Sequence, residues 1–536
     1  MVWLFDSICF DVTLLALTAV VTFYWWMTSK YSYWKSRGIP YLKPVPFFGN
    51  VKDLVLQKAY CGKVFQKIYN DLEGHRFGGV YFLFKPTLIV RDPELIKSLL
   101  IKDFPCFHDR GLGINEKLNP LSASLVTLSG SRWRNLRFKL APAFTSGKMK
   151  RMSNIMVECA LEMVNNIARL VDKDGSANMK SVAALFTTDV IGSCAFGLQM
   201  NSIKDPDSAF RKMGLKIFSP SLRRYISIFV MTCLPVFLQK ILHAFKDREL
   251  EKFFMDLVKD TVSFREQNKI IRDDFLQLLI QLKNDGKLEH EKEMTENDFN
   301  STGLTNARDN HTEQIEENEH DYEINEKQMA AQCLAFFAAG FETSSSTISF
   351  CLYELATNPG LQDKLKRDID AALEQHDGKL TYDCVLDVKY LDLVVEETLR
   401  KYPPAAILTR ICTKPYTVPG TRLRLEEGTD VKIPTYALHH DPDHYPRPEV
   451  FDPERFTPEN KRRRPQCTYL PFGEGPRMCI GMRFGLLQVK IGLATLLSKY
   501  QFEPCSKTRI PLVLDEKAIF TSAKGGIWLK ISEREK

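Results

Sequence analysis

The most informative part of the sequence is the stretch Pro471-Phe472-Gly473-Glu474-Gly475-Pro476-Arg477-Met478-Cys479-Ile480-Gly481. Two glycines and a proline ahead of the cysteine predict a turn, because glycine tolerates unusual backbone angles and proline lacks an N–H donor. The residues that follow have helical spacing, so Cys479 is expected in a loop just before a helix N-terminus, which favours a thiolate. A loop thiolate next to small residues suits an axial ligand of haem iron. For a lone cysteine, a buried free thiol would be the alternative.

A second stretch, Ala338-Ala339-Gly340-Phe341-Glu342-Thr343-Ser344, lies inside a long apolar helix predicted from Gln328 to Leu355. Ala339 and Thr343 are four residues apart, so they share one helix face. Small residues there predict a groove for dioxygen, with the Thr343 hydroxyl and the Glu342 carboxylate as catalytic groups that manage protons. A helix whose hydroxyls bond back to the preceding turn is the alternative.

Two charged motifs lie between this helix and the cysteine loop. Glu397-Thr398-Leu399-Arg400 places opposite charges on one helical face, and Pro453-Glu454-Arg455-Phe456 lies shortly before the loop. An exposed ion pair of this kind contributes under about 1 kcal/mol, so the tetrad alone would be ordinary. The segment His439-His440-Asp441-Pro442-Asp443-His444 could suggest a metal site, but Pro442 and the missing helical periodicity favour a polar turn.

The order of these motifs resembles that of the cytochrome P-450 family, the haem-thiolate monooxygenases. The cysteine loop matches F-G-x-G-P-R-x-C-I-G, the long helix A-G-x-E-T-S, and the charged motifs E-x-x-R and P-E-R-F. Trp133 and Arg137 add the family's W-x-x-x-R. The resemblance covers essentially the whole chain and looks most like the insect microsomal detoxification branch. It implies a mainly α fold with small β-sheets (α+β) behind an N-terminal transmembrane anchor.

The resemblance also implies which residues hold the cofactor, haem b (iron protoporphyrin IX). Cys479 would be the axial ligand of the haem iron. Because the haem propionates need cationic donors, further cofactor contacts are assigned to Arg110, Trp133, Arg137, Arg410, Phe472 and Arg477. Glu397, Arg400 and Arg455 would form a structural triad behind the haem.

The implied activity is insertion of one atom of dioxygen into lipophilic small molecules: xenobiotics such as plant toxins or insecticides, or endogenous lipids or steroids. The resemblance implies a pocket lined from the Phe107–Leu128 loop, the segment around Phe218, Ala335 and Ala339, residues 406–408 and the turn at Phe520. Such apolar walls suit lipophilic substrates. The alternatives are an oxygenase of hormone or lipid biosynthesis, a haem-thiolate isomerase, which Thr343 disfavours, and a haem sensor or electron carrier.

The chain carries no nucleotide or flavin motif, so electrons are expected from a separate protein. NADPH would act only through a partner NADPH–cytochrome reductase, with cytochrome b5 as a second partner. A docking surface for an acidic donor is one interpretation of the basic residues near the site, and a solvated face is the other. They are Arg132, Arg134, Lys139, Lys148, Lys150, Arg151 and Lys461-Arg462-Arg463-Arg464. A net charge of +7 over 536 residues, with no zinc-finger or basic-arm motif, argues against nucleic acid.

The N-terminus predicts a membrane anchor, residues 1–28. Val12 to Met27 is almost wholly apolar and, with the residues before it, just long enough for a bilayer, which takes roughly 20 residues. Lys30, Lys35 and Arg37 follow the apolar run, which puts the bulk of the protein in the cytosol. With the resemblance, this predicts a single-pass protein of the endoplasmic reticulum (microsomal) membrane. An aromatic belt at the membrane interface is expected from Tyr24, Trp25, Trp26, Tyr31, Tyr33 and Trp34.

A proline-rich hinge (residues 29–50) and a catalytic domain (residues 51–536) are expected after the anchor. Inside the domain, residues 284–326 predict a flexible acidic insertion, and Tyr225 to Leu238 predicts a core helix or a second bilayer contact. The 13 cysteines have no paired spacing, so reduced thiols are expected. Further expected elements are a hairpin at Gly79–Val90, helices at Leu361–Leu373 and Leu386–Lys401, and short strands at Thr413–Ile433.

Overall fold

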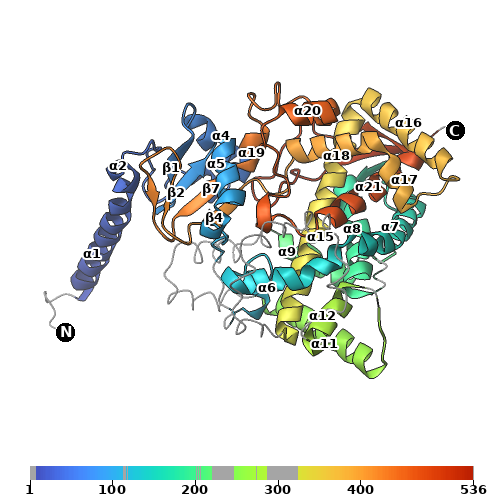
Figure 1. Ribbon diagram of the computed structural model, residues 1–536, viewed down its shortest axis with the longest axis horizontal. Helices are drawn as coiled ribbons and strands as arrows, with labels where there is room; N and C mark the ends of the chain where they lie inside the picture. The colour runs from blue at the N-terminus through green and yellow to red at the C-terminus, as the bar shows by residue number, and fades with distance from the viewer. Residues whose placement is uncertain are drawn as a thin grey trace.

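The computed structural model describes residues 8–112, 116, 119–198, 200, 202, 204, 205, 207–219, 247–272, 274–285 and 324–534. Helices dominate, and small sheets lie mainly near the N-terminal helix α1, which projects from the body (Figure 1). The chain thus has the predicted mainly helical architecture with small sheets.

The largest sheet has the strand order β1-β2-β7-β4. Strands β1 (Phe77–Phe82) and β2 (Lys85–Val90) form the predicted hairpin, while β7 (Asp430–Ile433) pairs parallel to β2 and antiparallel to β4 (Leu408–Ile411). Two smaller sheets pair β5 (Tyr416–Thr417) with β6 (Arg424–Leu425), and β9 (Trp528–Glu533) with both β3 (Ser176–Asn178) and β8 (Tyr500–Pro504).

Helix α15 (Glu326–Thr357) is the long helix predicted from its apolar pattern. It begins with a capping box, in which the side chains of Asn325 and Gln328 accept each other's backbone N–H at 3.0 Å. It packs against α8 (Met179–Phe196) and α21 (Met482–Lys499), the helix after the cysteine loop, as Figure 1 also shows. This packing gives α15 a central place in the helical region.

The other helices surround this centre or flank the large sheet (Figure 1). The predicted helix Leu386–Lys401 is split at Val388, whose ψ of 80° is not helical, into the end of α17 and α18. The bounds are α2 (Tyr33–Ser36), α3 (Lys52–Val55), α4 (Cys61–Asp71), α5 (Pro93–Lys97), α6 (Gly130–Leu140), α7 (Ser146–Asn165), α9 (Ala209–Phe218), α11 (Arg248–Gln267), α12 (Phe275–Asp285), α16 (Pro359–Gln375), α17 (Tyr382–Asp387), α18 (Lys389–Lys401), α19 (Thr435–His439) and α20 (Pro458–Arg463).

Helix α1 (Ile8–Ser29) is, within the described ranges, the one helix long and apolar enough to cross a membrane. Its described side chains from Val12 to Trp26 are exposed. Trp34, predicted to lie at the membrane interface, is instead fully buried, and its indole N–H donates to Val80 O at 2.9 Å. A side chain at Gly79 would collide with this indole ring. The sheet therefore provides a hydrogen-bond acceptor for the Trp34 indole and an apolar surface against which its ring packs.

Two predicted segments lie outside the described residues. They are most of the acidic insertion, at residues 286–323, and the whole Tyr225–Leu238 run. Part of the loop before Trp133, residues 113–115, 117 and 118, also lies outside them.

Candidate active site

The cysteine loop has the predicted form, a turn directly before a helix. Gly473 and Gly475 both have φ of +72°, and a side chain on Gly475 would collide with the Leu100 carbonyl group. The Cys479 N–H donates to Phe472 O at 2.8 Å, which closes the loop across its base. Helix α21 starts three residues later. Glycine is needed at position 475 for both conformation and space.

Cys479 keeps an exposed side chain but lies deep among protein atoms. This desolvation raises the pKa of its thiol above the ordinary value. The Gly481 N–H and the positive charges of Arg137 and Arg110 act in the opposite direction, but their effect is smaller. In the protein without haem, desolvation therefore opposes the thiolate that the position of the loop was expected to favour. A bound metal ion would reverse the balance, since coordination deprotonates a thiol.

Arg477 points away from solvent and ties the cysteine loop to the segment before α6. Its guanidinium donates to His108 O and Leu128 O, both at 2.7 Å. The same group lies 3.9 Å from the centre of the Trp133 ring, a cation–π contact. Burial, with the nearby charges of Arg110 and Arg410, lowers the pKa of Arg477 to about 8. Trp133 and Arg477, far apart in sequence, therefore form one unit.

The other three predicted arginines gather at the same place. Arg110 donates to Arg477 O at 3.0 Å, and Arg410 on β4 donates to Thr409 O at 2.9 Å. Burial lowers the pKa of Arg137 on α6 to about 10 and that of Arg410 to about 9. The Nε atom of Arg410 is buried and has no hydrogen-bond partner among the described residues.

This cluster is rich in buried positive charge. Asp109 contributes one carboxylate oxygen, 3.5 Å from Arg477 Nη2. Burying a charge costs free energy unless the charge is paired. Four guanidinium groups near one cysteine would therefore be stabilised by a bound anionic group. The two propionates of haem are such a group, and the donor set therefore fits that cofactor.

The two predicted catalytic side chains are neighbours on α15 but have different surroundings. The Thr343 hydroxyl donates to Ala339 O at 2.6 Å, the back-bonded geometry that was the alternative interpretation. Glu342 is buried and forms a 2.9 Å ion pair with Lys180 of α8. Gly340 lies against α8, where a side chain would collide with Ile191, so its use is close helix packing.

Lys180 is a functional candidate that the motif analysis missed. Its ammonium also donates to Ser345 Oγ at 2.9 Å and Ser346 Oγ at 2.6 Å, both on α15. Burial lowers the pKa of Lys180, and Glu342 opposes that shift. The one signal in the sequence was a lysine in the first turn of α8, between the buried residues Met179 and Val182.

Three phenylalanines from separate segments meet beside α15. Phe218 at the end of α9 stacks on Phe341 with a centroid distance of 6.1 Å and contacts Phe520 at 5.8 Å. Phe218 and Phe520 were both predicted to line the substrate pocket. Phe107, at the start of the loop predicted to line the pocket, is fully buried and contacts Tyr416 of β5 at 4.9 Å.

The predicted structural triad is present. Arg400 bonds both carboxylate oxygens of Glu397, at 2.7 and 2.9 Å, and Arg455 Nε lies 3.5 Å from Glu397 Oε1. Glu397 also accepts the Asp452 N–H at 2.9 Å. The triad joins α18 to the segment that leads to the cysteine loop.

Several members of the predicted basic surface are engaged in ion pairs. Arg132 pairs with Glu116 at 2.6 Å, Lys150 with Asp383 at 2.9 Å and Lys461 with Glu396 at 2.6 Å. Arg134 and Arg462 are exposed. A docking role for this surface stays a prediction.

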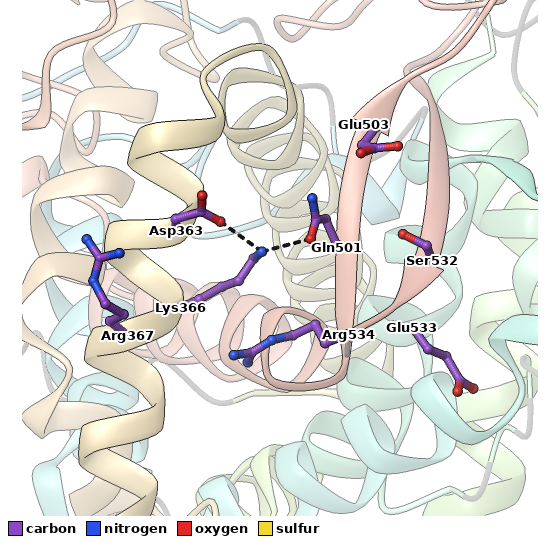
Figure 2. A pocket seen from close by; sticks show the side chains of 8 residues that line it. All are labelled: Asp363, Lys366, Arg367, Gln501, Glu503, Ser532, Glu533 and Arg534. Carbon is purple, nitrogen blue, oxygen red and sulfur yellow. Dashed lines mark hydrogen bonds and ion pairs between the residues drawn. The ribbon is translucent and has the colours of Figure 1, made fainter. Parts of the chain in front are cut away.

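An open pocket of about 500 Å³ lies away from these residues, between α16 and the strands β8 and β9 (Figure 2). Its lining consists of Asp363, Lys366, Arg367, Gln501, Glu503, Ser532, Glu533 and Arg534. The Lys366 ammonium donates to Asp363 Oδ1 on the same helix at 3.0 Å and to Gln501 Oε1 on β8 at 3.2 Å. This polar lining of mixed charge does not suit a lipophilic substrate.

Comparison with known proteins identifies the class. The family model described as Cytochrome P450 matches residues 39–307 and 305–530. The chain is 40% identical to Cytochrome P450 6k1 of Blattella germanica over 518 residues, 96% of either chain. It is 41% identical to Cytochrome P450 6a8 of Drosophila melanogaster over 520 residues, 96% of this chain and 97% of that one. Cytochrome P450 6j1 of Blattella germanica is 37% identical over 530 residues, 99% of either chain.

The chain therefore belongs to the cytochrome P450 family, whose members are haem-thiolate monooxygenases. Its relatives named above are insect proteins, which confirms the predicted family, fold and insect branch.

Proposed function

We propose that this protein is a membrane-anchored monooxygenase of the endoplasmic reticulum that oxidises lipophilic xenobiotics. Electrons come from NADPH through a partner reductase, with cytochrome b5 as a second donor. The family supports the reaction class, and the apolar helix α1 supports the anchor. Residues 1–28 form the anchor, 29–50 the hinge and 51–536 the catalytic domain, with residues 284–326 as an insertion.

Cys479 is proposed as the axial ligand of the haem iron. Arg110, Arg137, Arg410 and Arg477 hold the propionates, because they gather buried positive charge around the cysteine loop. Trp133 orients Arg477 through the 3.9 Å cation–π contact, and Phe472 closes the loop by accepting the Cys479 N–H. When bound, the haem supplies the dioxygen chemistry, and thiolate ligation favours O–O cleavage.

Glu342 and Thr343 are proposed to deliver protons during turnover. The Glu342 carboxylate lies next to the Thr343 position on α15, and its 2.9 Å ion pair with Lys180 fixes where the carboxylate oxygens lie. The Thr343 hydroxyl already donates to Ala339 O, so it can accept a further donor and pass a proton on after rotating.

The substrate is proposed to bind beside the phenylalanine cluster of Phe218, Phe341 and Phe520. Aromatic rings supply large apolar surfaces that exclude water and favour flat or lipophilic molecules. The walls come from α9, α15 and the turn before β9, so their exact shape, and with it the choice of substrate, depends on three separate segments.

The observation that carries the proposal is the gathering of three buried arginines, Arg137, Arg410 and Arg477, and the partly buried Arg110 around the loop that carries Cys479. The test is the carbon monoxide difference spectrum of the reduced protein, beside Cys479→Ala. A thiolate-type band far to the red, lost in the variant, is expected; a histidine-type band in the folded wild type would overturn the ligand assignment.

Turnover with purified reductase and NADPH then tests the substrate class. Oxidation of plant toxins and insecticides is expected. Oxidation confined to endogenous lipids or steroids would replace detoxification by biosynthesis while leaving the reaction class intact.

A further inference from the structure

The histidine-rich turn after β7 holds a feature that the proposed chemistry leaves unused. His439 at the end of α19 and the following His440 are both buried, His439 completely. They were predicted to belong to a polar turn, yet the two imidazoles lie inside the protein. Buried polar groups are normally hydrogen-bonded, and the partners of His439 are informative.

The imidazole of His439 bridges two segments that lie far apart in the sequence. Its Nε2 accepts the backbone N–H of Leu470 at 2.8 Å, and its Nδ1 lies 3.2 Å from the carbonyl oxygen of Arg400. A backbone N–H can only donate and a carbonyl can only accept, so the proton sits on Nδ1. Burial, with His440 and Arg400 nearby, holds the pKa of His439 well below its ordinary value, in agreement with a neutral ring.

From Leu470 the hydrogen bonds continue to the cysteine. Leu470 O accepts the Gly473 N–H at 3.1 Å, and Phe472 O accepts the Cys479 N–H at 2.8 Å. In the other direction, Arg400 donates to His439 O at 3.0 Å and holds Glu397 of the triad. The ring of His439 also stacks on Tyr469 with a centroid distance of 5.5 Å, so its plane is fixed.

We infer that His439 is a positioning residue, which transmits the fixed geometry of the triad on α18 to the loop that carries Cys479. The triad binds the main chain at Asp452, upstream of the loop, and His439 binds the main chain at Leu470, the residue directly before the loop. This inference rests on the proposed assignment of Cys479 as the haem ligand. If the hydrogen bonds of His439 to Leu470 and Arg400 are lost, we expect the cysteine loop to open more often and the Cys479 thiolate to be protonated more readily.

Three substitutions of His439 separate the two hydrogen bonds. His439→Phe keeps a ring to stack on Tyr469 and removes both bonds. His439→Gln can place an acceptor near the position of Nε2 and so retain the bond from Leu470, whereas His439→Asn can reach only the Arg400 side. His440→Phe is the matched control, since His440 is also buried and stacked, on Tyr436 at 4.2 Å, but its Nδ1 bonds only Tyr436 O of the preceding turn, at 2.8 Å.

Hydrogen exchange of the holoenzyme, followed in peptides that cover residues 470–481, is the first measurement. His439→Phe and His439→Asn should raise exchange there about tenfold, the effect of one lost buried hydrogen bond, and His439→Gln should raise it less. The second measurement is the rate at which the thiolate-type carbon monoxide band converts to a protonated-thiol band, and it should follow the same order. His440→Phe should leave both unchanged.

The inference would be overturned if folded His439→Phe showed the same hydrogen exchange and the same rate of band conversion as the wild type. It would also be overturned if His439→Phe and His440→Phe changed both quantities equally. A wild-type enzyme without the thiolate-type band would instead overturn the ligand assignment, and the hydrogen-exchange result would still report on the bridge itself.

Discussion

Lys180 Nζ lies 2.9 Å from Glu342 Oε1, and the ammonium group also binds the hydroxyls of Ser345 and Ser346. One lysine from the first turn of α8 thus contacts three residues within one turn of α15, next to Thr343. Because both charged groups are mostly buried, removing one of them would leave the other charge without a partner in a poorly solvated place.

Breaking this pair from one side should destabilise the protein and disturb turnover together. Lys180→Met leaves Glu342 buried and unpaired, which should lower the free energy of unfolding by about 2 kcal/mol. NADPH consumed per product should rise several-fold, because the proton carrier has lost its partner. Thermal unfolding and product counting check the two effects.

The double variant Lys180→Met with Glu342→Gln is the control. It should recover most of the stability, since no unpaired charge remains, but not the coupling of NADPH to product. If the losses in free energy of unfolding caused by Lys180→Met and Glu342→Gln simply added up in the double variant, a direct interaction between the two side chains would be contradicted.

Arg410→Met should affect stability and haem binding in opposite directions. The buried guanidinium has an unpartnered Nε, and burial lowers its pKa to about 9, so in the absence of haem the charge is a cost. The apoprotein variant should be as stable as wild type or about 1 kcal/mol more stable, while haem loss becomes about tenfold faster. Haem transfer to a scavenging globin measures the loss. An apoprotein destabilised as much as the holoenzyme would assign Arg410 a structural role instead.

Gly475→Ala should prevent normal closure of the cysteine loop. The residue has φ of +72°, and the new methyl group would collide with the Leu100 carbonyl, so we expect a loss of about 2 kcal/mol or more and poor haem incorporation. Gly360→Ala in the first turn of α16 is the matched control, because nothing lies within 4 Å of the added methyl group. Equal haem content in the two variants would refute the steric argument.

The buried histidines predict acid sensitivity. Burial is the main cause that lowers the pKa of His440 to about 3 and that of His439 well below its usual range. In the unfolded chain both would bind a proton near pH 6.5. From about pH 6.5 downward the unfolded state therefore binds more protons, and stability falls with decreasing pH by up to about 1.4 kcal/mol per unit for each histidine.

Thermal unfolding between pH 7.5 and 5.5 measures this slope. His440→Phe removes one of the two titrating groups and should flatten the decline. A steeper or unchanged slope in that variant would show that other groups cause the acid sensitivity.

Much of the architecture was predictable because its signals are local. The glycines and proline of the cysteine loop, the apolar period of α15, the hairpin β1–β2 and the apolar run of α1 each require only neighbouring residues to be recognised. The arginines of the site were found through motif order, since nothing local distinguishes Arg410 or Arg477 from a solvated surface charge.

The placement of Trp34 was wrong because a distant segment forms its environment. In the sequence, Trp34 has the pattern of an interfacial aromatic residue, but in the fold its indole N–H donates to Val80 O of β1 and its ring is buried in protein. Hydropathy alone cannot tell a side chain buried in protein from one buried in lipid, because both surroundings are apolar.

The protein family, the cysteine loop and the helix that carries Glu342 and Thr343 could all be predicted from the amino-acid sequence, since they follow from short-range backbone preferences and ordered motifs. The contact of Lys180 with Glu342 and that of His439 with the segment before the cysteine loop became visible in the folded protein alone. Those contacts join residues 162 and 31 positions apart, respectively, and depend on how helices and loops pack. Packing brings together groups whose separation no local pattern records, and their charges and hydrogen bonds gain strength from the burial that packing creates.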